Sequence, residues 1–158
     1  GCVNLRNKKY HFFNQPLTKE EYEKKLKKIV QEKNLEDKIK FIGPMANKGM
    51  QNHYWNNDIF INLAPTGGLD KAVLEAMASS LPVIVTNRAF EGHLGEYKDL
   101  LLCKDENENM LAKEIYEKIS TLSADSNREQ IGKYLHKQVI MRSSLENLII
   151  SIVRIIQS

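Results

Sequence analysis

The chain has 158 residues, with 23 Lys and Arg side chains against 20 Asp and Glu, and a formal net charge of +3. That length suits one domain with a core of ordinary size, so we expect residues 1–158 to form a single domain. The charges of both signs are spread along the chain, which argues against a nucleic-acid partner held by a basic patch.

Short apolar runs alternate with longer amphipathic ones, a pattern typical of βαβ units and of a parallel sheet flanked by helices. The sequence therefore predicts an α/β fold with a helical C-terminus. In chain order we expect a strand at 10–13, a helix at 18–33, a strand at 39–42, a helix at 49–55, a strand at 59–63, a helix at 70–79, strands at 82–86 and 100–103, and helices at 108–122, 128–139 and 144–156.

The first predicted helix carries a start signal as well as an apolar stripe. Thr18 and Glu21 have the Ser/Thr-x-x-Glu spacing of a capping box. The stripe recurs at helical spacing and consists of Tyr22, Leu26, Ile29 and Val30.

Right-handed crossovers between the predicted strands place their carboxyl ends at one edge of the sheet, where open α/β folds bind ligands. The loops expected there are residues 14–17, 43–48, 64–69 and 87–95.

The loop at 64–69 is the most informative one. Its glycine pair, Gly67 and Gly68, lets the backbone turn sharply and approach a ligand closely. The helix that begins near Asp70 offers unpaired N–H groups and the positive end of its dipole, which together suit a phosphate.

Glu75 lies about one turn into that helix and is a carboxylate on an otherwise apolar segment. Lys71 stands four residues before it, so the two also have the spacing of an ordinary surface ion pair, worth about 0.2–0.5 kcal/mol to a helix. The residues alone leave both interpretations open.

Three segments in succession resemble one known family. Residues 35–44 (LEDKIKFIGP), 54–61 (YWNNDIFI) and 74–84 (LEAMASSLPVI) are similar, in order and in spacing, to the C-terminal domain of group 1 (family 4) GT-B glycosyltransferases. The resemblance covers most of the chain. It implies a Rossmann-like domain, and we therefore expect the chain to belong to a glycosyltransferase.

The resemblance implies that this domain binds a nucleotide-diphosphate sugar, while an N-terminal half of the same enzyme binds the acceptor. In the family, two Glu residues separated by seven positions mark the donor loop and helix. The second corresponds to Glu75, and the resemblance implies that its carboxylate accepts hydrogen bonds from both vicinal hydroxyls of the donor ribose. The implied donor-binding residues are Gly67, Gly68, Leu69, Asp70, Lys71 and Glu75.

The first of the two family Glu residues corresponds to Gly67, so here the chain departs from the pattern. One interpretation is that backbone N–H groups of the glycine pair bind the diphosphate or sugar, with Asp70 or Lys71 replacing the missing carboxylate. Lys71 would then stabilise the charge of the departing diphosphate. The other is that sugar recognition has been partly lost, which leaves room for a non-catalytic nucleotide-binding or scaffold module.

Other positions carry weaker implications. Asn14 and Gln15 follow the first predicted strand, where the family places residues near the nucleotide, although Asn14-Gln15-Pro16 also has the composition of an ordinary turn. Gly43, Pro44 and Met45 correspond to the loop that runs beside the nucleobase in the family.

The remaining expectations concern chemistry and partners. The resemblance implies metal-independent transfer, and the chain agrees in having no Asp-x-Asp motif and no His cluster at zinc-ligand spacing, so we expect no cofactor besides the nucleotide sugar. From the resemblance we also expect retention of stereochemistry, a hexosyl donor, a glycan or lipid-linked acceptor, and a role in cell-envelope polysaccharide synthesis.

The resemblance also implies that the family's first strand and helix would precede Gly1, so we expect the chain to be a fragment that is inactive alone. Two cysteines, Cys2 and Cys103, predict a thiol-reducing, cytoplasmic location. The apolar run at 145–156 predicts a helix with two partners, the second being the N-terminal half of the enzyme, and self-association where that face is exposed. Simple burial against the sheet and contact with the inner face of a membrane are the alternatives.

Overall fold

The computed structural model describes residues 11–12, 15–43, 45, 47–64, 67–105, 107–147 and 149. The chain divides into two compact units, Gly1–Met45 and Ala46–Ser158, which we describe one at a time.

The first unit contains a short hairpin and one helix. Strand β1 (His11–Phe12) pairs antiparallel with β2 (Gln15–Pro16), so the strand expected at 10–13 is present in its described part but does not enter a parallel sheet. Only two residues connect β1 to β2, and a connection that short closes a hairpin. Helix α1 (Lys19–Glu32) follows, with the predicted capping box in place: Thr18 Oγ1 accepts from the Glu21 backbone N–H, and the Glu21 carboxylate accepts from the Thr18 N–H.

The prediction of a strand at 39–42 is wrong. These residues form no strand, and the side chains of Ile39, Phe41 and Ile42 are all exposed. Their β-branched and aromatic composition favours an extended chain, but a strand also needs a hydrogen-bonded neighbour, which composition cannot supply.

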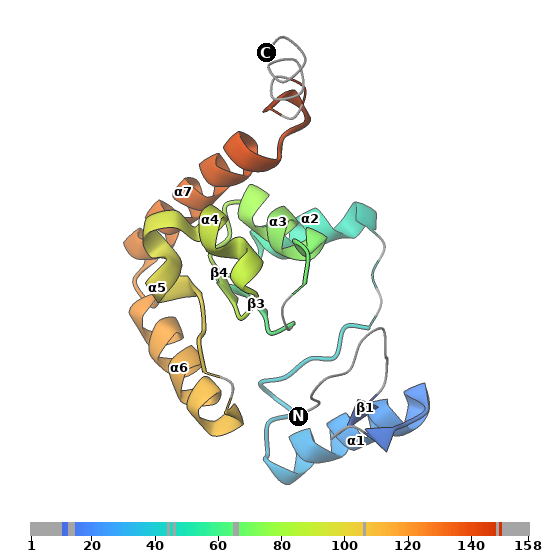
Figure 1. Ribbon diagram of the computed structural model, residues 1–158. Helices are drawn as coiled ribbons and strands as arrows, with labels where there is room; N and C mark the ends of the chain where they lie inside the picture. Colours follow the sequence, from blue (N-terminus) through green and yellow to red (C-terminus); the bar gives the residue numbers. More distant parts are fainter. Residues whose placement is uncertain are drawn as a thin grey trace. The chain divides into compact units, whose positions relative to one another are not determined.

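The second unit is built on one βαβ unit (Figure 1). Helix α2 (Asn47–Trp55) leads to β3 (Phe60–Asn62), α3 (Lys71–Ala78) crosses over, and β4 (Val83–Val85) pairs parallel to β3 with Ile61 opposite Ile84. The predicted α/β class with a small parallel sheet is confirmed. Three apolar residues in a row make β4, and all three are buried, as expected of a strand covered on both faces.

Short helical turns follow β4: η1 (Arg88–Phe90), α4 (Glu91–Leu94), η2 (Gly95–Tyr97) and α5 (Lys98–Leu101). The prediction of a strand at 100–103 is therefore wrong, because Leu100 and Leu101 belong to α5. Leucine favours a helix, and a short apolar run does not distinguish a strand from a buried helical turn. What remains of the prediction is one parallel bridge between Leu102 and Val85.

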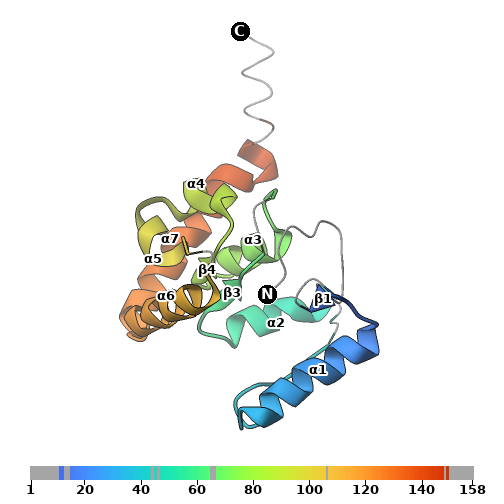
Figure 2. The same cartoon turned by 60° about the horizontal axis from the view of Figure 1, so that its bottom comes forward.

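Two long helices complete the described chain. Helix α6 (Glu108–Thr121) matches its prediction, and α7 (Asp125–Ser143) begins three residues earlier and ends four residues later than expected. Figures 1 and 2 show α7 along α3, and Leu135 of α7 is fully buried with Met77 of α3 in the core of this unit. Most of the helix expected at 144–156 lies outside the described residues.

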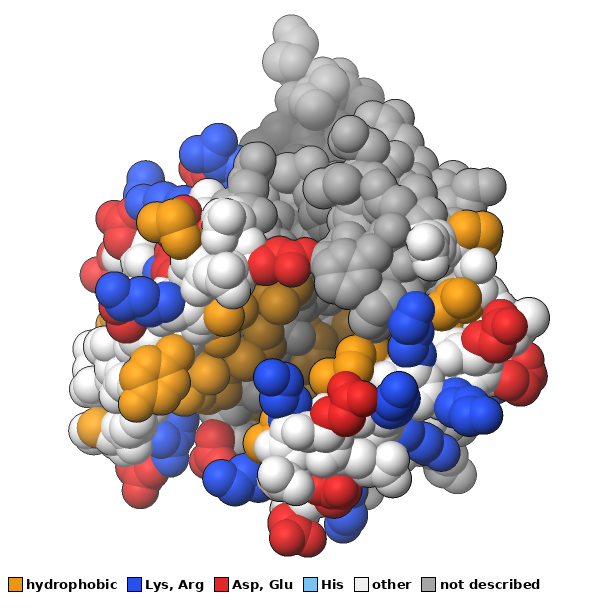
Figure 3. Space-filling model, turned by 90° about the horizontal axis from the view of Figure 1, so that it is seen from below, with side chains coloured by type: hydrophobic (Ala, Val, Ile, Leu, Met, Phe, Trp, Pro, Cys, Tyr) orange, Lys and Arg blue, Asp and Glu red, His pale blue; other side chains and the backbone are white. Residues whose placement is uncertain are grey.

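Charged side chains of both signs are interspersed on the face drawn in Figure 3, as the composition suggested. Within the described ranges, no helix combines the length and apolar character needed to cross a bilayer.

Candidate functional site

The carboxyl ends of β3 and β4 lie at the same edge of the sheet because the two strands run parallel. The loops that leave this edge are tied to each other. Thr86 Oγ1 donates to the Ala64 carbonyl at 3.0 Å, and Asn87 Nδ2 donates to the Gly68 carbonyl at 3.0 Å. Asn87 is buried, so its amide is fixed by packing and the second bond holds the glycine loop in place.

Asp70 fixes the other end of the loop as the N-cap of α3. Its Oδ1 accepts from the Ala72 backbone N–H at 2.9 Å, and its Oδ2 accepts from Asn62 Nδ2 at 3.1 Å. The Asn62 side chain in turn accepts from the Ala64 N–H at 2.9 Å. Both carboxylate oxygens of Asp70 thus accept hydrogen bonds from within the chain, and the residue stabilises the turn before α3.

The glycine pair is not required by the fold itself. Neither Gly67 nor Gly68 has a positive φ, and a Cβ added to either would meet no atom within 4 Å. The missing side chains therefore leave open space beside the start of α3. Leu69, the next residue, is also exposed.

Glu75 places a second carboxylate one turn into α3, and its side chain is 39% exposed. Tyr54 donates a hydrogen bond from its hydroxyl to Glu75 Oε2 at 3.2 Å. Lys71 Nζ lies 3.3 Å from Glu75 Oε1, so the expected i, i+4 ion pair exists. Burial, and then the hydrogen bond to Glu75, raise the pKa of Tyr54 above its ordinary value, so the hydroxyl keeps the proton that it donates.

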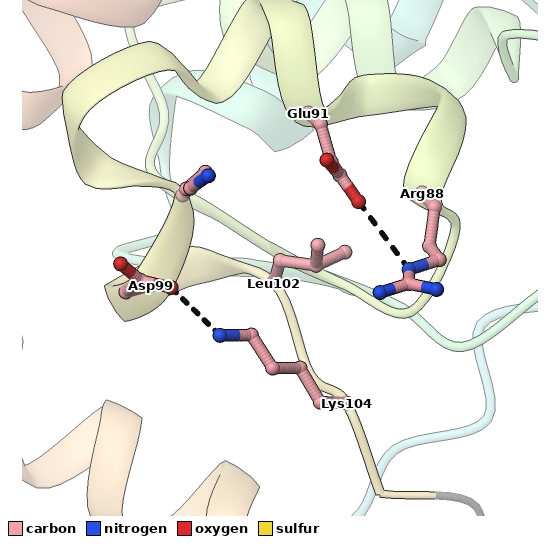
Figure 4. A pocket seen from close by; sticks show the side chains of 6 residues that line it. Arg88, Glu91, Asp99, Leu102 and Lys104 are labelled. Carbon is pink, nitrogen blue, oxygen red and sulfur yellow. Dashed lines mark hydrogen bonds and ion pairs between the residues drawn. The ribbon is translucent and has the colours of Figure 1, made fainter.

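A hollow of about 110 Å³ follows the loop after β4 and is lined by Arg88, Glu91, Lys98, Asp99, Leu102 and Lys104 (Figure 4). Arg88 Nε pairs with Glu91 at 3.3 Å, and Lys104 Nζ pairs with Asp99 at 2.7 Å. The bond from Lys104 lowers the pKa of Asp99, which keeps that carboxylate charged. Because carboxylates neutralise two of its cations, the hollow attracts anions weakly, and we assign the candidate site to the loop after β3.

Comparison with known proteins decides the family. The model of the family described as glycosyl transferases group 1 matches residues 18–138, well over half of the chain. The chain belongs to the group 1 glycosyltransferases. No curated protein and no solved structure matches it.

The structure brings together the donor-site residues expected of this glycosyltransferase domain that lie in the second unit. Asp70 and Lys71 stand at the start of α3, Glu75 one turn further in, and the glycine pair immediately before them. Gln15, in β2, and Gly43 and Met45 belong to the first unit; Gly43 has a φ of +74°. Asn14 and Pro44 lie outside the described residues.

Three residues of the candidate site have no counterpart among the predicted ones: Tyr54, Asn62 and Asn87. Asn62 and Asn87 each lie at or just after the end of a strand, and that position was a usable signal because strand ends meet at the ligand-binding edge. Tyr54 is 21 residues from Glu75, and no spacing rule connects residues of two different helices.

Proposed function

We propose that this domain binds the nucleotide-diphosphate sugar from which a longer glycosyltransferase transfers its sugar. In that enzyme an N-terminal half holds a glycan or lipid-linked acceptor, and transfer of a hexosyl group proceeds with retention and without a metal. The loop after β3 and the first turns of α3 form the donor site.

One observation carries the proposal. Neither the backbone conformation nor the packing requires glycine at positions 67 and 68, and the pair leaves open space beside it. This space lies at the carboxyl edge of a parallel sheet, just before a half-exposed carboxylate. A fold has no need of such a pair there, but a ligand that must approach the backbone closely does.

Glu75 is the residue we assign to the ribose. An ionised carboxylate has two oxygens with about four acceptor positions, enough for both hydroxyls of a vicinal diol. The side chain is exposed enough to reach a ligand, yet Tyr54 holds one of its oxygens.

Lys71 is the residue we assign to the diphosphate. Its side chain is 79% exposed and, within the described part of the chain, is held by a surface ion pair alone, so moving it to a phosphate costs little. There it would stabilise the negative charge that develops as the diphosphate leaves.

A non-catalytic module of the same fold is the second candidate. The observation that favours it is Gly67, which stands where the family signature has its first Glu. A site without that carboxylate can keep nucleotide binding and lose sugar transfer.

Titration calorimetry tests the proposal on the 158-residue chain with UDP-, GDP- and ADP-sugars. We expect one of the three classes to bind, and Glu75→Ala to weaken it about tenfold or more, since hydrogen bonds to a charged group contribute about 1.5–3 kcal/mol. Glu117→Ala is the matched control, because Glu117 also forms an i, i+4 ion pair, with Lys113, on α6. Binding that Glu75→Ala leaves intact would refute the ribose assignment, and binding without transfer by a full-length protein would favour the scaffold module.

A further inference from the structure

The Glu75 carboxylate is held from the interior of the domain on one side and approached from solvent on the other. Tyr54, whose hydroxyl donates to Oε2 at 3.2 Å, is 5% exposed. Lys71, which lies 3.3 Å from Oε1, is 79% exposed. The two contacts therefore differ in rigidity: a long solvated side chain cannot fix the direction of a carboxylate, but a buried ring can.

The Tyr54 ring is fixed by its packing. It belongs to the buried core and forms a T-shaped pair with Phe60, the first residue of β3, with ring centroids 5.9 Å apart and an angle of 74° between the planes. A packed ring keeps its hydroxyl at one place, and the hydroxyl then restricts the last torsion of the Glu75 side chain.

The contact with Tyr54 leaves Glu75 able to bind a diol. The phenolic hydroxyl has a single proton and uses one of about four acceptor positions of the carboxylate. Each oxygen therefore keeps at least one position for a ligand hydroxyl, in an orientation set before the ligand arrives. Preorganisation of this kind lowers the cost of binding.

We propose that Tyr54 is a positioning residue that aims Glu75 at the donor ribose and so sets the preference of the site for ribonucleotides over 2′-deoxyribonucleotides. This inference rests on the proposed function, since it requires Glu75 to bind the ribose. It adds a determinant of specificity that itself makes no contact with the ligand.

The test compares the affinity for a nucleoside diphosphate with that for its 2′-deoxy analogue, using whichever of UDP, GDP and ADP binds the chain. Tyr54→Phe removes one oxygen atom and leaves the ring on Phe60, and we expect it to reduce the ribose preference roughly three- to tenfold. Tyr97→Phe is the matched control: the Tyr97 hydroxyl also takes part in a 3.2 Å hydrogen bond, from Gln130 Nε2. It should leave the preference unchanged. Circular dichroism checks that both variants are folded.

An unchanged preference in Tyr54→Phe, or equal weakening of both analogues, would overturn the positioning role. The proposed function fails in a different way: the wild-type chain then binds no nucleotide, or Glu75→Ala leaves its ribose preference as it was. Either of these results overturns the inference as well, whereas a Glu75 effect without a Tyr54 effect overturns the inference alone.

Discussion

Gly132 of α7 lies directly against the carbonyl oxygen of Ser80, the residue that ends the turn after α3. A Cβ at position 132 would collide with that oxygen and with the Ser80 carbonyl carbon. The colliding atoms belong to the backbone, so they cannot swing away as a side chain would. The close approach of α7 to α3 therefore depends on the absence of a side chain at this residue.

Gly132→Ala is expected to lower the free energy of unfolding by about 2 kcal/mol or more, because the added methyl group must push two packed helices apart. Urea denaturation followed by circular dichroism measures the change. Gly67→Ala is the control: its Cβ would meet nothing within 4 Å, so its stability should stay within about 0.5 kcal/mol of the wild type. Equal stability of the two variants would contradict the packing of α7 on α3.

Ser80→Gly is expected to stabilise the domain. Ser80 has a φ of +60°, and its N–H donates to the Met77 carbonyl while Leu81 donates to Ala76, the two bonds of a Schellman motif. Glycine adopts this conformation without the penalty that serine pays there, so we expect a gain of about 0.5–1 kcal/mol after the added entropy of the unfolded chain.

The neighbouring Ser79 supplies the control for Ser80. Its φ is −84°, which any residue adopts, and glycine there only adds freedom to the unfolded chain. Ser79→Gly should therefore be destabilising by about 0.5–1 kcal/mol. The opposite signs of two adjacent Ser→Gly substitutions, measured by thermal unfolding, check the left-handed conformation of Ser80.

Asp70→Ala is expected to lower the free energy of unfolding by about 1–2 kcal/mol, because it removes the N-cap of α3 together with the bond from Asn62. Asp70→Asn keeps an oxygen that can cap the helix, so it should cost less than Asp70→Ala. Chemical denaturation ranks the variants, and an equal loss in Asp70→Asn and Asp70→Ala would show that the charge, and not the capping oxygen, is what matters.

His93 should make the domain less stable in mild acid. It is buried in α4, where its Nε2 lies 2.9 Å from Ser143 Oγ, and burial, followed by the charge of Arg142, lowers its pKa. The unfolded chain then binds more protons than the folded chain between the ordinary histidine pKa, about 6.5, and the lowered one. The contribution of neutral His93 to the free energy of unfolding is constant above that pH range and is lost as the pH falls through it.

The measurement for His93 is the free energy of unfolding at pH 7.5 and at pH 5.5. The wild-type chain should lose more stability between these values than His93→Gln does, because glutamine has no proton to gain. A loss of the same size in the variant would assign the pH dependence to other groups.

The fold was predictable where a local sequence pattern agrees with the packing of the folded chain around it. Thr18 and Glu21 form the predicted capping box, and the run from β3 through α3 to β4 lies where periodicity placed it. The strands expected at 39–42 and 100–103 failed because their composition favours extended or buried backbone in general, whereas pairing depends on a neighbour that a sequence pattern does not contain.

In the candidate site, too, the residues close together in the sequence were predictable and the contacts between distant residues were not. Glu75 and the glycine pair were identified from their order along the chain, since they lie close together in one loop and helix. The bonds from Tyr54 to Glu75 and from Asn87 to Gly68 connect residues 21 and 19 positions apart, and each bridges two elements. Contacts of this kind follow from the packing of elements, which local spacing does not determine.

The open space beside Gly67 gives this position unusual freedom to vary. Because an added Cβ there meets no atom within 4 Å and the backbone has no positive φ, a substitution can place a charge, an amide or a hydroxyl at the proposed sugar site without a clash at the Cβ. Stability and side-chain chemistry are thus separable at residue 67, so the chemistry of this position can change without a more stable scaffold being needed first.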